Sequence, residues 1–288
     1  MVMSRFIRQS IPALCFCMVA LVAFAITQQE GGEYQPEVYQ AGKDVVWVPT
    51  EQALVDMMLD MAKVTSRDYV IDLGSGDGRT VIAAAKRGAR ALGIEYNPDM
   101  VALSRRNAAR EGVADRAQFI RADLFESDFS DASVVTMFLL TEINLKLRPR
   151  ILGLKPGTRI VSNTFDMGEW KADQIGSIDD RERCPNRFCT AYFWIVPARV
   201  EGSWKLPQGE LVLKQSFQMI SGFLKSNDGA VVVTKGRLRG DQISFIAGGS
   251  QYMGKVRENA MEGTVKSGDA TAPWSASRMG KLAAAPSR

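Results

Sequence analysis

The fold of this chain is decided by the stretch Tyr69–Arg79, which reads YVIDLGSGDGR. A short apolar run with one acidic residue comes first, glycine then stands at every second position, and a helical run follows from Thr80. Glycine lets the backbone turn sharply and approach a ligand because it has no Cβ. The start of the next helix offers backbone N–H groups without partners in the helix. The stretch therefore predicts an open α/β sheet with a ligand at the carboxyl end of this strand.

Acidic residues also end the next two predicted strands. The strand 91–95 ends in Glu95, and the strand 117–121 leads into Asp123. The spacing G-x-G-x-G differs from the dinucleotide fingerprint G-x-G-x-x-G, and Asp72 beside it is a poor neighbour for pyrophosphate but a good one for a cation. Three such carboxylates suit a nucleoside with positive charge and N–H donors, as in S-adenosylmethionine. The alternative is that each acid caps the helix or turn that follows it.

Several segments around these acids resemble class I S-adenosylmethionine-dependent methyltransferases, over about residues 45–175. Within that superfamily the chain most resembles the protein-lysine methyltransferases that modify the mitochondrial adenine-nucleotide translocase and the ATP synthase c subunit, together with their bacterial relatives. The segments that carry the resemblance are Val48-Pro49-Thr50, Asp72 to Lys86, Gly93-Ile94-Glu95-Tyr96-Asn97-Pro98, Ser104-Arg105-Arg106, Arg110-Glu111-Gly112-Val113 and Ala122-Asp123-Leu124.

The resemblance implies a site for the methyl donor S-adenosylmethionine. The predicted donor-binding residues are Pro49, Thr50, Asp72, Gly74, Ser75, Gly76, Glu95 and Asp123. Glu95 would hold both ribose hydroxyls, Asp123 the adenine amino group, and the backbone of 74–76 would form the cradle. Asp72 would orient this turn and favour the cationic end of the donor. The segment that ends in Thr50 would fold over the donor, the alternative being that Thr50 only caps the following helix. No catalytic residue is predicted.

The chain of 288 residues has no histidine. This excludes imidazole bases, Ser-His and Cys-His nucleophiles and histidine metal sites. Methyl transfer from a sulfonium can proceed without them, because the leaving group needs no proton. The net charge is a mild +4 without clustered Lys and Arg, so no nucleic-acid partner is expected.

Cys184 and Cys189 are separated by four residues and lack partner ligands. This spacing is not C-x-x-C and argues against zinc, so no metal is expected. Two free thiols and a local disulfide both remain open.

Residues 1–28 are predicted to be a signal peptide or a membrane anchor. Arg5 and Arg8 precede an apolar run from Ile11 to Ile26 that contains a signal-peptidase-like site, Ala23-Phe24-Ala25. The charge bias would send the rest of the chain across the membrane, whereas the methyl donor is made inside cells. A targeting or anchoring role without export is the alternative, so the side of the membrane stays open. Residues 29–44 are predicted to be a linker.

Residues 45–197 are predicted to form the methyltransferase domain, with strands alternating with helices on both faces of a parallel-type sheet. The strands are expected at 69–73, 91–95, 117–121, 133–138, 158–163 and 188–196, and the helices at 51–62, 78–87, 98–111 and 141–153. Asn97 is a candidate cap for the helix that begins with Pro98. The resemblance implies a Rossmann-like, seven-stranded sheet whose last strand is antiparallel.

The fourth strand should form the edge of the reaction pocket. Amino-methylating nucleic-acid enzymes of this fold carry Asn or Asp, Pro-Pro and an aromatic residue here, and this chain does not. An apolar wall with Thr136, Thr141 and Glu142 remains, which could receive the stem and ammonium of a lysine. The alternative for Glu142 is an acid that favours the start of a helix. The segment 163–166 is a second candidate for the lip of this pocket.

Residues 200–279 are predicted to form a small all-β domain, a barrel or a sandwich, because short alternating segments are separated by Asn, Asp and Gly turns. Gly202-x-Trp204 and the late Arg278 weakly resemble lipocalin-type barrels, in which such a Trp and Arg stack. The interior could hold a ligand, although a filled core that serves for docking is the commoner arrangement. Residues 280–288 are predicted to be a disordered tail.

These patterns predict a methyltransferase that acts on a lysine nitrogen of a protein, with membrane proteins as candidate substrates. The alternatives are a small-molecule or lipid methyltransferase, and an exported binding protein without catalysis. The sequence does not predict the oligomeric state.

Overall fold

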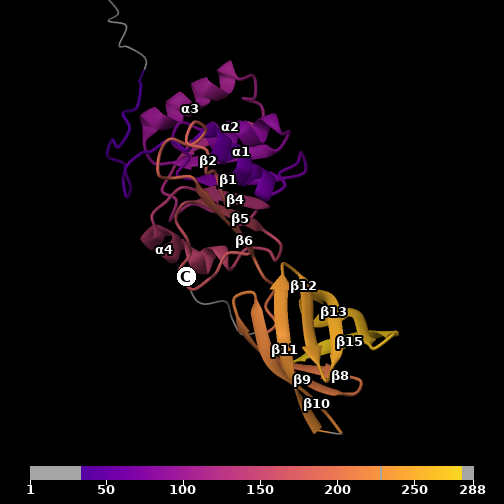
Figure 1. The fold of residues 1–288 in the computed structure, drawn as a ribbon. Coiled ribbons are helices and arrows are strands. Elements are labelled where there is room, and N and C mark those ends of the chain that lie inside the picture. The colour runs from indigo at the N-terminus through magenta and orange to yellow at the C-terminus, as the bar shows by residue number, and fades with distance from the viewer. Residues whose placement is uncertain (1–33, 228, 281–288) are drawn as a thin grey trace, which may run out of the picture. The chain divides into compact units, whose positions relative to one another are not determined.

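The computed structural model describes residues 34–227 and 229–280 (Figure 1). The predicted signal or anchor at 1–28, the first part of the predicted linker and nearly all of the predicted tail lie outside the described residues. Of the helices within the described part, none has the length and apolar character needed to cross a membrane.

The methyltransferase domain is built on a seven-stranded sheet with the order β3-β2-β1-β4-β5-β7-β6. Its strands are β1 (Tyr69–Leu73), β2 (Arg90–Glu95), β3 (Ala117–Arg121), β4 (Val134–Met137), β5 (Arg159–Asn163), β6 (Gln174–Ser177) and β7 (Thr190–Ile195). Strands β1 to β5 pair in parallel, whereas β7 pairs antiparallel with both β5 and β6. The predicted seven-stranded sheet with an antiparallel last strand is confirmed. The short β6, largely exposed, was not predicted.

Helices cover both faces of this sheet, as expected (Figure 1). They are α1 (Gln52–Met61), α2 (Arg79–Lys86), α3 (Pro98–Arg110) and α4 (Thr141–Ile151). Alternate residues of a strand point to opposite faces. Val70 of β1 therefore packs in one core cluster with α1, α2 and α3, whereas its neighbour Ile71 packs in the other with α4.

Side-chain caps were predicted at the starts of two helices near the sheet edge, and the structure contains one of them. Asn97 caps α3 as predicted, since its Oδ1 accepts from the N–H of Asp99 at 2.9 Å and Pro98 is the first helical residue. The predicted cap at Thr50 is wrong, because α1 begins after Glu51 and has no side-chain cap. The hydroxyl of Thr50 instead accepts from Asn163 at the end of β5, so the segment before α1 is tied to the sheet edge.

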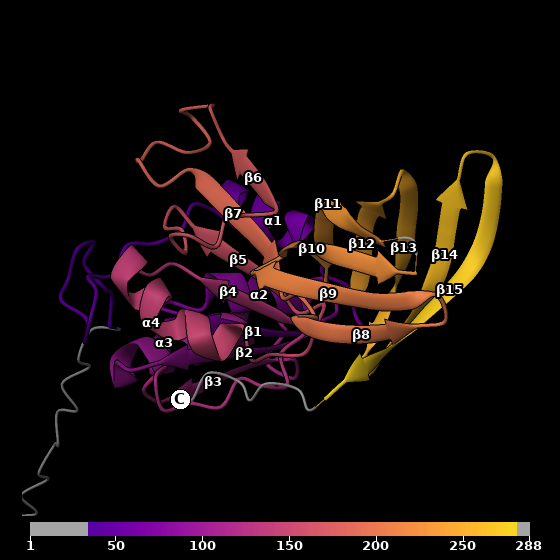
Figure 2. The ribbon, with the colours of Figure 1, turned by 90° about the horizontal axis from the view of Figure 1, so that it is seen from below.

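The second domain is a closed barrel of eight antiparallel strands (Figure 2). They are β8 (Gly202–Leu206), β9 (Gly209–Ser216), β10 (Met219–Ser226), β11 (Gly229–Arg239), β12 (Gln242–Ala247), β13 (Ser250–Arg257), β14 (Ala260–Ser267) and β15 (Ala270–Met279). Pairing of β15 with β8 closes the ring, which decides between the predicted barrel and sandwich.

Aromatic side chains fill the interior of the barrel. Trp204 is fully buried, and Phe245 stacks on Tyr252 at 4.7 Å between ring centroids with Trp274 edge-on to both. The guanidinium of Arg278 lies 4.1 Å from the centroid of the Trp204 ring, the contact expected from the lipocalin-like pattern. This domain therefore has a packed core of its own.

Candidate functional site

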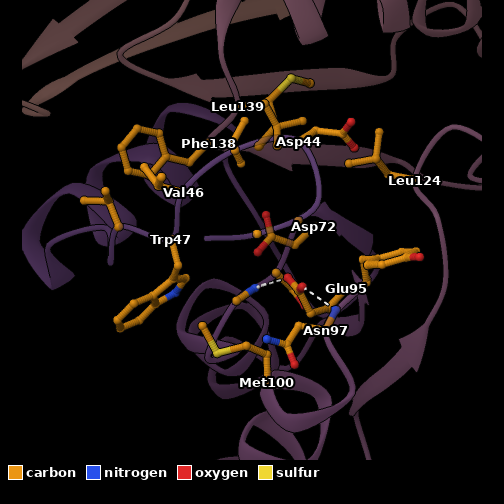
Figure 3. A pocket seen from close by; sticks show the side chains of 18 of the residues that line it. Asp44, Val46, Trp47, Asp72, Glu95, Asn97, Met100, Leu124, Phe138 and Leu139 are labelled. Atoms are coloured by element: carbon orange, nitrogen blue, oxygen red, sulfur yellow. Dashed lines mark hydrogen bonds between the residues drawn. The ribbon is translucent and has the colours of Figure 1, made fainter. Parts of the chain in front are cut away.

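A pocket of about 380 Å³ lies at the carboxyl ends of the parallel strands (Figure 3). All eight predicted donor-binding residues line it: Pro49, Thr50, Asp72, Gly74, Ser75, Gly76, Glu95 and Asp123. The strand order places β1 at the centre of this edge, with β2 and β3 on one side and β4 and β5 on the other. The fold thus brings together residues that are up to 74 positions apart in the sequence, Pro49 and Asp123 being the extremes.

The glycine turn between β1 and α2 explains the unusual spacing. Gly74, Gly76 and Gly78 all have positive φ, at 76°, 53° and 83°. A Cβ at Gly78 would stand 2.7 Å from the ring of Phe119, so backbone conformation and space both require glycine there. The turn thereby passes close under the pocket and exposes its backbone to a ligand.

Glu95 joins this turn to the start of α3. Its Oε2 accepts from the N–H of Gly76 and its Oε1 from the N–H of Asn97, both at 2.9 Å (Figure 3). A carboxylate oxygen has two lone pairs, so each oxygen can accept one more hydrogen bond from the pocket side. Two hydroxyl groups on neighbouring carbons, as in a ribose, match this arrangement.

Asp72 is buried at the floor of the pocket, where Thr136 Oγ1 donates to its Oδ1 at 2.6 Å. Burial raises the pKa of the Asp72 carboxyl to about 7, and repulsion from Glu95 and Asp77 adds to this while the Thr136 hydrogen bond opposes it. A cationic ligand beside Asp72 would favour its ionised form. The prediction that Thr136 receives a substrate lysine is wrong, because its side chain is fully buried and bonded to Asp72.

Thr141 and Glu142 do not line the pocket either. Both lie in the first turn of α4, and Glu142 is exposed there. The alternative interpretation of Glu142, an acid that favours the start of a helix, fits its position. The pocket wall at this point consists of apolar residues instead, namely Met137, Phe138, Leu139, Leu140 and Ile143.

Asp123 follows β3 and has two partners. Its Oδ1 accepts from the N–H of Phe125 at 2.9 Å, and Lys43 Nζ donates to its Oδ2. The hydrogen bond from Lys43 is the main cause that holds the pKa of Asp123 below its usual range. The ammonium of Lys43 also stands 5.2 Å from the centroid of the Tyr96 ring. Lys43 was predicted to lie in a linker, and this contact was not predicted.

The segment before α1 lies over the glycine turn. A Cβ at Gly76 would come within 2.6 Å of Trp47 Nε1, so the indole rests directly on that glycine. Trp47 is fixed by backbone hydrogen bonds of 2.8 and 2.9 Å with Tyr39 and Gln40. Trp47 was not predicted as a site residue, although the apolar run 45–48 in an otherwise polar stretch could have indicated it.

Three phenylalanine rings form a cluster in the pocket wall at the ends of β4, β5 and β7. Phe138 lies 6.1 Å from Phe165 and 5.2 Å from Phe188, and the last two rings are 6.3 Å apart, all between centroids. Phe165 belongs to the predicted lip at 163–166. Phe188 was expected in a strand, but β7 begins only at Thr190.

Cys184 and Cys189 form a disulfide that closes the turn before β7. This resolves the alternative that the sequence left open. No group of His, Cys, Asp or Glu side chains that could hold a metal ion occurs among residues 34–227 and 229–280.

The pocket fits S-adenosylmethionine on three observations. The Ser75 hydroxyl is buried in the pocket wall and has no hydrogen-bond partner among the described residues. Such a group calls for a polar ligand. Glu95 can accept two hydroxyls, and the buried Asp72 favours a nearby cation.

Comparison with known proteins agrees with this fit. A family model described as the ANTKMT methyltransferase domain matches residues 72–174. A protein-lysine N-methyltransferase of Saccharolobus islandicus is 40% identical over 155 residues, which cover 53% of this chain and 94% of that protein. The human lysine N-methyltransferase of the ATP synthase c subunit is 36% identical over 130 residues, or 45% of this chain. This chain spans about half of that human relative, 55% of its length.

A similar solved structure is that of an RNA methyltransferase from Salinibacter ruber in complex with S-adenosyl-L-homocysteine. It is 46% identical, covers 53% of this chain and 96% of that chain, and has a TM-score of 0.49.

Proposed function

The chain belongs to the protein-lysine N-methyltransferases, and on this premise we propose that it transfers a methyl group from S-adenosylmethionine to the side-chain nitrogen of a lysine in a protein substrate. The observation that carries the proposal is the placement of Glu95, which holds the glycine turn at Gly76 and the start of α3 at Asn97 while it faces the pocket. This one carboxylate therefore fixes both backbone segments that would border a bound nucleoside at the carboxyl edge of the sheet.

The residues of the pocket would act mainly by alignment. S-adenosylmethionine, when bound, supplies a methyl group on a positively charged sulfur. Glu95 would accept the ribose hydroxyls, Asp123 the adenine amino group, and the ionised Asp72 would favour the cationic part of the donor. In well-oriented systems, holding the two reacting groups in line lowers the entropic part of the barrier by about 7 kcal/mol or more.

The lysine nitrogen reacts as a free amine. It forms the new N–C bond while the C–S bond breaks, the bonding pair stays on sulfur, and S-adenosylhomocysteine leaves. The proton of the entering ammonium passes to water before this attack, and the methylated nitrogen then carries the positive charge. Because an ammonium cannot attack, the apolar pocket wall assists by lowering the pKa of the entering lysine through desolvation.

We also propose that the protein is associated with a membrane. The pattern of Arg5 and Arg8 before the apolar run from Ile11 to Ile26 supports it, although residues 1–28 lie outside the described part. The disulfide of Cys184 favours an oxidising compartment, whereas the donor is made inside cells.

A second candidate function, an exported binding protein, rests on that disulfide. A reporter fused after Glu30 tests it: activity of the reporter only outside the cytoplasm supports export, and activity inside contradicts it.

A transfer assay tests the proposed activity. The full chain is incubated with S-adenosylmethionine carrying a labelled methyl group and with either the membrane or the soluble fraction of cells. We expect the label in protein, as methyl-lysine after acid hydrolysis, and no transfer by Glu95→Ala. Label that is removed by lipid extraction or by ribonuclease, and not by protease, would contradict a lysine substrate.

A further inference from the structure

The pocket has two chemically different ends. The acidic residues occupy one half of the sheet edge: Asp123 follows β3, Glu95 is the last residue of β2, and Asp72 is the last but one of β1. The other half lies at β4, β5 and β7. Figure 3 shows Phe138 on the opposite side of Asp72 from Glu95. The pocket therefore runs from the acidic residues at β3 to the phenylalanine cluster.

The strand ends on the second side contribute only apolar residues to the pocket. The residues that line it at the ends of β4, β5 and β7 are Met137, Phe138, Leu139, Leu140, Ile143, Phe165 and Phe188. The three rings are half-buried, so each keeps part of its surface toward the pocket. Rings at these separations leave faces and edges available to a guest of small cross-section.

Phe165 is held in place by its backbone. Its carbonyl oxygen accepts from Ser162 Oγ at 2.6 Å and from Asn144 Nδ2 at 3.0 Å. The preceding Thr164 has a φ of 60°, in the left-handed region that residues with a Cβ rarely adopt. Local strain of this kind persists where the surroundings fix it, and it gathers at functional sites.

Phe188 is held by the disulfide-closed turn between Cys184 and Cys189. Its N–H donates to Asn186 Oδ1 at 2.8 Å, and Asn186 Nδ2 donates to Glu51 Oε1 at 2.9 Å. The turn is thereby attached to the residue before α1. Polar contacts of the neighbouring backbone and of Asn186 thus position the rings of Phe165 and Phe188.

We propose that Phe138, Phe165 and Phe188 form the binding site for the acceptor lysine side chain, an inference that rests on the proposed function. Four methylene groups would pack on the rings, and the ammonium would meet their faces by cation–π attraction. The rings themselves carry no charge, so they stabilise the ammonium only through this attraction. Repulsion from the positively charged sulfur of S-adenosylmethionine, when the donor is bound, would then lower the pKa of the lysine nitrogen and favour loss of its proton.

The first test measures binding of the side chain alone. The probe is n-butylammonium, which has the length and charge of a lysine side chain, and its neutral counterpart is 1-butanol. Each is titrated by NMR against the full chain saturated with S-adenosylhomocysteine. We expect n-butylammonium to bind about tenfold more tightly, the size of a desolvated cation–π contact. Equal or tighter binding of 1-butanol would overturn the proposal and indicate a neutral apolar substrate.

The second test separates ring chemistry from packing. Phe188→Leu keeps an apolar side chain but removes the aromatic face, and Phe188→Ala removes both. We expect the Kd of n-butylammonium to rise about three- to thirtyfold in either variant, with the Kd of S-adenosylmethionine unchanged. The matched control is Phe223→Leu, since Phe223 is 48% exposed on β10 and does not line the pocket. That control should leave both constants unchanged.

The outcomes distinguish this inference from the proposed function. If the chain methylates protein lysines but the Phe188 variants keep the wild-type KM and n-butylammonium affinity, only the acceptor site is refuted. If n-butylammonium binds as expected but no lysine is methylated, the acceptor site stands and the proposed activity fails. A folded wild-type chain that does not bind n-butylammonium overturns the site itself.

Discussion

Replacing Asp72 by Asn should make the protein more stable and at the same time weaken its binding of the donor. Asp72 is 6% exposed, and burial raises the pKa of its carboxyl to about 7. In the unfolded chain this carboxyl has its ordinary pKa of 3.8, so the folded state holds the proton more tightly. Stability is then full below about pH 4 and is lost as the pH rises toward 7 and above. Asn at this position is never charged and avoids the loss.

The size of the effect follows from the shift in pKa. A rise from 3.8 to about 7 corresponds to at most about 4 kcal/mol of unfolding free energy at neutral to alkaline pH. We expect Asp72→Asn to gain about 2–4 kcal/mol near pH 8 and almost nothing near pH 4. The hydrogen bond from Thr136 can be kept, since the amide oxygen of Asn accepts as the carboxylate does.

Donor binding should change in the opposite direction. A cationic ligand binds best when Asp72 is ionised, so the affinity of the wild type for S-adenosylmethionine should rise about tenfold between pH 6 and pH 8. Asp72→Asn should bind more weakly near pH 8 and show little dependence on pH. The measurements are urea unfolding followed by circular dichroism and calorimetric titration, both across this range of pH. A variant that is less stable than the wild type near pH 8, or that keeps the rise in affinity, would refute the reasoning.

Three further variants test separate parts of the structure. Glu95→Gln replaces one of the two oxygens that accept from the N–H groups of Gly76 and Asn97, and it should weaken donor binding by about 1–3 kcal/mol in calorimetry; an unchanged affinity would remove Glu95 from the site. Joint replacement of Cys184 and Cys189 by Ser should raise the KM for a protein substrate several-fold without changing the donor Kd, and a reductant should do the same to the wild type; a KM that does not move would show that the turn has no positioning role. Trp204→Ala should lower the free energy of unfolding of the barrel by about 3–5 kcal/mol in a denaturant titration, and a loss below about 1 kcal/mol would contradict a packed interior.

Local patterns allowed much of the site to be predicted from the sequence. Asp72, Glu95 and Asp123 stand at the ends of successive strands, and parallel strands bring their carboxyl ends to one edge. The alternating glycines around Gly76 indicate a turn with positive φ, and the structure has positive φ at these glycines. The cap at Asn97 could be predicted because Asn97 directly precedes Pro98, a pair that is typical of a helix start. The roles assigned to the eight donor-binding residues stay predictions until the donor itself is bound.

Features that depend on distant partners were missed. Lys43 and its partner Asp123 are separated by 80 positions, and nothing in the polar run around Lys43 indicates that pairing. Thr136 was placed in the substrate pocket because the alternation along β4 does not show that Asp72 of the neighbouring strand takes up its hydroxyl. Thr50 has the residue type of a helix cap, but Asn163 of β5 binds it instead. In each case tertiary contacts outweighed the local preference.

The most direct test of the account is a calorimetric titration of the full chain with S-adenosylmethionine and with S-adenosylhomocysteine. The structure predicts one site per chain with micromolar affinity, because the glycine turn, Glu95 and Asp72 are already in position. The donor should bind more tightly near pH 8 than its product, whose sulfur is neutral, because Asp72 favours the sulfonium charge. Absence of binding by protein with a normal unfolding transition would contradict the donor site and, with it, the proposed methyl transfer.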